Sequence, residues 1–177
     1  MPLKVRVDDQ WVEIGGGSSG NGGSSSNITL ETPQSSTSGT EVEFTGIPSW
    51  AKRITLMFNL VSLDSNANYQ IQLGTSSAYI TSGYTATSQS EDGVNDPNST
   101  TAFLVFNPNN SSIHAGKFEI DKFSDTAYTF VGQTRTTDSS GTQAYGVLNG
   151  VSGTIDRLKI TPTSGDFDGG SINISYE

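Results

Sequence analysis

The stretch that decides the fold is Val42–Leu63, VEFTGIPSWAKRITLMFNLVSL, which contains the only long apolar run in the sequence. Its first four residues, Val42–Thr45, alternate apolar and polar side chains, the period-two pattern of a half-buried strand. Pro48 then fixes its own φ and keeps Ile47 extended, while Gly46 permits a sharp bend. We therefore expect one strand, a fixed corner, and a second strand.

The second strand should lie in the centre of a sheet. Ile54–Val61 is apolar on both faces, which is typical of a strand covered on both sides, and its threonine and β-branched residues favour a strand over a buried helix turn. The apolar residues expected in the core or at a contact between copies of the chain are Phe44, Ile47, Pro48, Trp50, Ile54, Leu56 and Phe58.

The rest of the chain also has the pattern of short strands separated by turns. The sequence has 177 residues, of which 32% are hydrophobic and 20 are glycine. Ser, Thr, Asn, Gly and Pro cluster in segments such as 32–40 and 88–100, where we expect turns. The expected strands are 27–31, 41–46, 52–62, 68–73, 77–81, 101–106, 112–120, 126–135, 143–149, 154–161 and 171–176. This pattern predicts an all-β fold, a jelly-roll-like antiparallel β-sandwich preceded by a short N-terminal hairpin or arm.

The charge and composition argue against several classes of function. The net charge is −9 and the nine Lys and Arg form no basic stripe, which disfavours nucleic acid and anionic membranes as partners. There is no cysteine, so a disulfide framework and a thiolate metal site are excluded. No apolar run has the roughly 18 residues of a membrane helix, so we expect no membrane insertion. Charges near the N-terminus interrupt the apolar core that a signal peptide requires.

The chain divides into three parts. Residues 1–14 alternate like a small hairpin, which is marginal in isolation and should dock on a partner. Residues 15–26, GGGSSGNGGSSS, have the composition of a flexible linker, and residues 27–177 form the β-sandwich domain. The first part is interpreted as an anchoring arm whose contact residues are Leu3, Val5, Val7, Trp11, Val12 and Ile14.

The catalytic motifs are incomplete. His114 is the sole histidine, so it is interpreted as a satisfied or exposed strand histidine rather than a catalytic base or metal ligand. Glu119 and Asp121 are two residues apart on one strand face, as at the start of the E-x-D-x-E or E-x-D-x-x-E signature of laminarinase-like glycosidases. A retaining mechanism needs a second carboxylic acid, but Phe123 and Ser124 occupy its positions. We expect no enzymatic activity.

Two weaker patterns concern ligands. Asp166 and Asp168 in GDFDGG are typical of a tight turn and are weak candidates for calcium, because the downstream glutamate of an EF-hand is missing. No other cofactor is expected. Tyrosines beside polar loops can supply rigid contact area for a sugar or a protein, and the candidates for receptor contact are Tyr79, Tyr84 and Tyr145.

Three segments carry a resemblance to a known class of proteins. The opening LKVRVDDQWVEIGGG is similar to the short leader of virion proteins from marine phages, including cyanophages. VEFTGIPSWAKRITLMF with the following YQIQLG, and the final GTIDRLKITPTSGDFDGGSINISYE, resemble the C-terminal β-rich module of bacteriophage tail fibres. The resemblance implies a virion component, a homotrimer with its leader towards the particle and other virion proteins as partners.

The resulting hypothesis is a non-enzymatic phage structural protein in the virion, assembled in the host cytoplasm. Its arm attaches it to the particle, and its β-domain trimerises or contacts a host-surface glycan or protein. A fibre normally has a long shaft, which this chain lacks, so a capsid decoration or head-fibre protein is the alternative. A carbohydrate-binding module or glycosidase-like tail spike is the second alternative, and Glu119 and Asp121 would then matter chemically.

Overall fold

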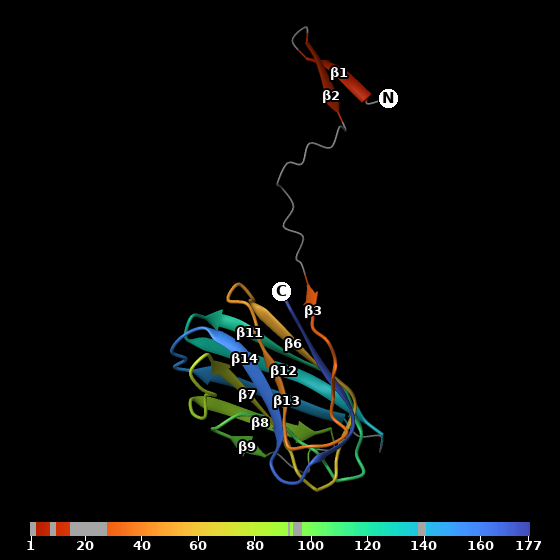
Figure 1. Cartoon of the computed structure of the whole chain (residues 1–177), viewed down its shortest axis with the longest axis vertical. Coiled ribbons are helices and arrows are strands. Elements are labelled where there is room, and N and C mark those ends of the chain that lie inside the picture. Colours follow the sequence, from red (N-terminus) through yellow and green to blue (C-terminus); the bar gives the residue numbers. More distant parts are fainter. Residues whose placement is uncertain (1–2, 8–9, 15–27, 92, 94–96, 138–140) are drawn as a thin grey trace.

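The computed structural model describes residues 3–7, 10–14, 28–91, 93, 97–137 and 141–177. All regular elements in these residues are strands (Figure 1). Their bounds are β1 Leu3–Val7, β2 Gln10–Ile14, β3 Thr29–Leu30, β4 Gln34–Ser35, β5 Val42–Thr45, β6 Arg53–Leu63, β7 Tyr69–Thr75, β8 Tyr84–Ser90, β9 Asn98–Ser99, β10 Phe103–Val105, β11 His114–Ser124, β12 Ala127–Thr136, β13 Gly141–Asn149, β14 Ile155–Pro162 and β15 Phe167–Tyr176.

The strands from β3 onward form an antiparallel β-sandwich, which confirms the predicted fold class. The smaller sheet has the order β10-β7-β14-β5. The larger sheet has the order β3-β15-β6-β11-β12-β13-β8-β9, and β4 also pairs with β15. The successive strands β5, β6, β7 and β8 alternate between the two sheets, as in a jelly roll, and the β11–β12 hairpin is inserted between β6 and β13.

The predicted N-terminal hairpin is present as an antiparallel pair. Strands β1 and β2 pair from Leu3 opposite Ile14 to Val7 opposite Gln10. Among the described residues, these two strands have no strand partner except each other. The side-chain contacts predicted for the arm, including those of Trp11, and the whole of 15–26 lie outside the described residues.

The core between the sheets is built on a continuous group of aromatic rings. Phe103 stacks on Phe130 with a centroid distance of 4.6 Å, and Phe130 stacks on Phe118 at 5.3 Å. Phe58 contacts Phe118 edge-on at 5.7 Å and Tyr69 at 5.2 Å. Aromatic pairs of this kind each contribute about 0.5–1.5 kcal/mol beyond their area burial. The residues therefore join β6, β7, β10, β11 and β12 into one core.

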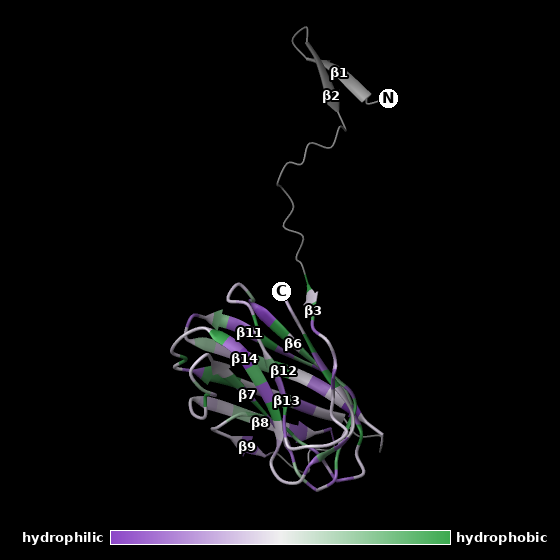
Figure 2. Ribbon diagram, viewed as in Figure 1, coloured by the Kyte–Doolittle hydropathy of each residue, from purple (hydrophilic) through white to green (hydrophobic). Residues whose placement is uncertain are grey.

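The bend before β6 forms as predicted. The prediction that β6 is covered on both faces is wrong, because only one face is buried. Gly46 has a φ of 79° and Ile47 is buried after it. Along β6 the side chains of Ile54, Leu56 and Phe58 are buried and those between them are partly exposed. Asn59 and Leu60 are both exposed, which interrupts the alternation before the buried Val61. The outer face of the larger sheet has no covering layer among the described residues, which is why one face of β6 stays in contact with solvent. Figure 2 shows the same alternation of apolar and polar residues along the strands of the sandwich.

The predicted core set is right except at Pro48 and Trp50. Pro48 is only partly buried, and Trp50 is 51% exposed with its ring edge against Tyr176 at 5.6 Å. Trp50 lies in the turn before β6, beyond the closed part of the core. Its predicted role at a contact between copies of the chain stays a prediction.

Four of the expected assignments are wrong. Strand β8 begins before the predicted turn segment 88–100 and continues into it, and β9 and β4 also lie in predicted turns. The expected strand 77–81 is reduced to a single bridge between Tyr79 and Gly74. Strand β8 alternates buried and exposed residues like any half-buried strand, but its inward side chains include the polar Ser88 and Ser90.

Candidate functional site on the outer face of the larger sheet

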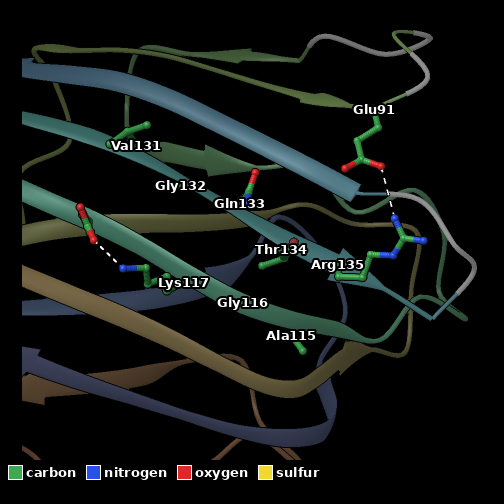
Figure 3. A pocket seen from close by; sticks show the side chains of 10 residues that line it. Glu91, Ala115, Gly116, Lys117, Val131, Gly132, Gln133, Thr134 and Arg135 are labelled. Atoms are coloured by element: carbon green, nitrogen blue, oxygen red, sulfur yellow. Dashed lines mark hydrogen bonds and ion pairs between the residues drawn. The ribbon is translucent and has the colours of Figure 1, made fainter.

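An open groove of about 470 Å³ lies over β11 and β12 on the larger sheet (Figure 3). Glu91 and Arg135 stand at one end of it, and Lys117 and Glu119 lie along β11. The residues that line it are Glu91, Ala115, Gly116, Lys117, Glu119, Val131, Gly132, Gln133, Thr134 and Arg135.

The pairing of four strands places amide side chains in one row across this face. Lys117 of β11 is opposite Gln133 of β12, Gln133 is opposite Gln143 of β13, and Gln143 is opposite Gln89 of β8. Residues directly opposite each other project from the same face of a sheet. We call Lys117, Gln133, Gln143 and Gln89 the glutamine row.

A second row runs beside the first and is more apolar. Glu119 is opposite Val131, and Val131 is opposite Tyr145. Val131 is 45% exposed and Tyr145 is 40% exposed, so both present apolar surface to solvent. The Tyr145 hydroxyl donates a hydrogen bond to the Gln143 amide oxygen, which fixes this amide and leaves its NH₂ group pointing away from the tyrosine.

The charges of the groove are balanced. Lys117 pairs with Glu119 at 2.7 Å, and Arg135 pairs with Glu91 at 3.4 Å. The hydrogen bond from Lys117 lowers the pKa of the Glu119 carboxyl. The groove is therefore a nearly neutral surface on a chain of net charge −9.

The candidate glycosidase residues share a face, as predicted, and are both held in ion pairs. Glu119 is bound by Lys117, and Asp121 accepts a hydrogen bond from Arg53 Nε at 2.6 Å. Arg53 also contacts Glu177 at 3.1 Å. Phe123, at the position where the signature requires an acid, is 78% exposed. These carboxylates are thus part of a charged outer surface. The general acid that a retaining glycosidase needs is not supplied by this pair.

His114 is a buried structural residue. It has no exposed surface, and its two ring nitrogens lie 2.9 Å from Thr134 Oγ1 and 3.1 Å from Asn107 Oδ1. Its ring also contacts Tyr69 edge-on at 5.2 Å. This confirms the interpretation as a satisfied strand histidine.

The two calcium candidates are joined to neighbouring residues by hydrogen bonds. The Asp166 backbone N–H donates to Asp64 Oδ1 at 2.9 Å, and Ser62 Oγ donates to Asp168 Oδ1 at 2.5 Å. Over the described ranges, no group of three or more His, Asp or Glu side chains converges as a metal site requires. Asp64 and Asp166 are 102 residues apart in the sequence, so their hydrogen bonds join the loop after β6 to the loop before β15.

Of the three tyrosines predicted to contact a receptor, only Tyr145 is in the groove region. Tyr84 is 2% exposed, with its ring against Phe103 at 5.0 Å, so its assignment as a receptor contact is wrong. It is an inward residue of β8, where the core closes over it. Tyr79 is partly buried, donates its hydroxyl hydrogen to Glu43, and lies under the Lys159 ammonium at 4.6 Å. Tyr79 therefore lies against the smaller sheet, through its contacts with β5, β7 and β14.

The sequence-based predictions missed most of the groove. They named neither its glutamines nor the Glu91–Arg135 pair. A signal was present, because Gln133 and Arg135, and likewise Gln143 and Tyr145, are two residues apart on predicted strands and so share a face. What could not be read is which strands lie side by side.

The described residues include no helix that is long and apolar enough to cross a membrane.

Comparison with known proteins gives this chain no relative from which a role could be taken, because no family model, no curated protein and no solved structure matches it.

Proposed function

We propose that the chain is a non-enzymatic structural protein of a phage particle, attached through residues 1–14 and presenting the jelly roll to the outside. The observation that carries the proposal is the division of the strands into a two-stranded N-terminal hairpin and a sandwich with which the hairpin shares no strand pairing. Strands β1 and β2 pair with each other, and every strand of the sandwich follows the Gly/Ser-rich residues 15–26. The hairpin would serve as the anchor, the Gly/Ser-rich residues as a linker, and the sandwich as the displayed head.

The groove supports a recognition role for the head rather than catalysis. The carboxylates of Glu119 and Asp121 are engaged by Lys117 and Arg53. A glycosidase also needs a carboxylic acid that keeps its proton near neutral pH, and Phe123 and Ser124 occupy the positions of the signature that would hold it. In this proposal the head associates as a homotrimer and faces the host surface.

A chain lacking residues 1–14 tests the attachment. We expect the truncated protein to remain folded, with the strand circular dichroism and thermal transition of the full chain, and to be absent from purified particles. Unfolding on truncation would mean that the hairpin belongs to the core, and normal incorporation would mean that the anchor lies elsewhere.

The capsid decoration role is the second candidate, favoured by the lack of a shaft between the Gly/Ser-rich residues and β3. The copy number of the chain in purified particles separates the two roles. A tail component should be present in few copies at one vertex, and a capsid decoration protein in many copies over the whole shell.

A further inference from the structure

We infer that the glutamine row and the adjoining Val131 and Tyr145 bind an extended neutral polysaccharide. The inference rests on the proposed display of the sandwich towards a host surface and names the ligand class of that surface. It is carried by the spacing, the hydrogen-bonding capacity and the charge balance of the groove.

The spacing of the row suits a linear repeating ligand. Gln133, Gln143 and Gln89 come from three adjacent antiparallel strands, so successive amides are separated by about 4.8 Å, the distance between neighbouring strands. This is close to the length of one hexopyranose unit in an extended chain. One amide can therefore meet each successive sugar.

The amides are available for a ligand. A primary amide has two donors and an acceptor, which matches sugar hydroxyls that both donate and accept. The side-chain amides of Gln89 and Gln133 have no partner among the described residues. The Gln143 oxygen is held by Tyr145, so its NH₂ group has a fixed direction. Fixed polar groups lower the entropic cost of binding.

The adjoining row supplies the apolar half of the site. Sugar rings have apolar C–H faces, and Tyr145 and Val131 present apolar surface next to the amides. Tyrosine provides this area with few rotatable bonds, and its place on a strand holds it in position. The combination of apolar patches and a small number of polar groups is usual for ligand sites.

The charge balance favours a neutral ligand over a polyanion. Lys117 and Arg135 are both paired with carboxylates, so they are not free to neutralise phosphate, sulfate or uronate groups. The chain as a whole has a net charge of −9, which repels a polyanion at long range.

Native affinity electrophoresis of the full chain tests the inference, since an acidic protein enters such gels. The gels contain hydroxyethylcellulose, glucomannan or galactomannan as extended neutral probes, and alginate or heparin as anionic probes. We expect at least one neutral polysaccharide to retard the protein and the anionic ones to leave its mobility unchanged. The double variant Gln133→Ala/Gln143→Ala should weaken the retardation about tenfold, and Tyr145→Ala by a similar factor.

Gln70→Ala is the matched control, because Gln70 is a partly exposed strand glutamine on the outer face of the smaller sheet. It should bind like the unmodified chain, and thermal unfolding should show that all variants are folded. Equal retardation of the double variant, retardation by the anionic probes alone, or no retardation by any neutral probe overturns the inference. If the chain lacking residues 1–14 still enters particles while retardation depends on the glutamine row, the attachment proposal fails and the ligand class stands.

Discussion

At the residue scale, the most unusual backbone position is Leu60 in β6. Its φ is 56°, in the left-handed region, and its side chain is 56% exposed. Gly170 of β15 lies opposite, and a Cβ added to it would approach Leu60 O to 2.3 Å. The register of β15 with β6 shifts here, between Gly169 and Ser171. The pair therefore forms a β-bulge that bends both strands.

Replacement of Leu60 by asparagine should stabilise the protein. A left-handed conformation costs a leucine about 1–2 kcal/mol, whereas asparagine adopts it more readily. We expect Leu60→Asn to raise the free energy of unfolding in urea by about 1 kcal/mol. Leu30→Asn is the control, since Leu30 is 64% exposed and has no positive φ. A Leu60 variant less stable than the Leu30 variant would show that the leucine side chain is needed.

Buried tyrosines predict a pH dependence at the alkaline end. Burial raises the pKa of Tyr69, Tyr84 and Tyr128. The stability linked to these groups is therefore fully present below their unfolded pKa of about 10 and is lost as pH rises above it. In an alkaline titration, we expect most tyrosinate absorbance to appear together with the loss of the strand circular dichroism signal. Complete tyrosinate absorbance in a chain that keeps its strand signal would contradict this expectation.

At the element scale, β8 shows how a strand with small polar residues can be an inner part of the fold. Ser88 has no exposed surface, donates to the Gln143 carbonyl at 2.8 Å and accepts from the Phe106 backbone N–H at 2.9 Å. One hydroxyl thus joins β8 to β13 and to the segment after β10. Buried polar groups are tolerated when they are hydrogen-bonded in this way.

Removal of this hydroxyl should destabilise the sandwich. Ser88→Ala leaves the partly buried Phe106 N–H without its acceptor, which costs about 1 kcal/mol or more. Thr85→Ala on the outward face of the same strand should change the stability by less than about 0.5 kcal/mol. Chemical denaturation of both variants measures the difference. Equal stabilities would mean that a backbone rearrangement or a water molecule replaces the serine.

The strands that were predicted correctly have a local apolar pattern, whereas the missed strand β8 depends on partners that are distant in the sequence. Strands β5 and β7 have apolar side chains at every second residue, and β6 and β14 do so except at one irregularity each, which is a local pattern. In β8 the inward positions are occupied by Tyr84, Ala86, Ser88 and Ser90, and the serines read as a turn. The burial of Ser88 depends on hydrogen-bond partners supplied by β13 and the segment after β10, which a local pattern does not contain.

At the scale of the whole molecule, two exposed aromatic residues lie at the end of the sandwich where the chain terminates. Trp50 is 51% exposed and Phe123 is 78% exposed. The segments that carry them are joined by the hydrogen bond from Lys122 N to Lys52 O at 2.8 Å. We propose that these two residues belong to an interaction surface.

We expect these residues to contribute to the proposed self-association. The double variant Trp50→Ser/Phe123→Ser should sediment with a lower mass than the unmodified chain, because the contact loses its apolar area. Tyr145→Ser, which changes an exposed tyrosine on another part of the surface, should sediment like the unmodified chain. A monomeric unmodified chain would remove the trimer from the proposal.

The sequence by itself determined the all-β class, the positions of the apolar strands, the bend at Gly46 and the structural nature of the lone histidine. These follow from the alternation of apolar and polar residues, from the backbone restrictions of glycine and proline, and from residue counts. Each of these can be read from neighbouring residues or from a total over the sequence. The tertiary structure alone decided that β6 has an outer face in solvent, that Trp50 is outside the core, and that Gln89, Lys117, Gln133 and Gln143 form one row. Strand pairing over long sequence separations sets that row, and its register depends on the packing of the whole sandwich.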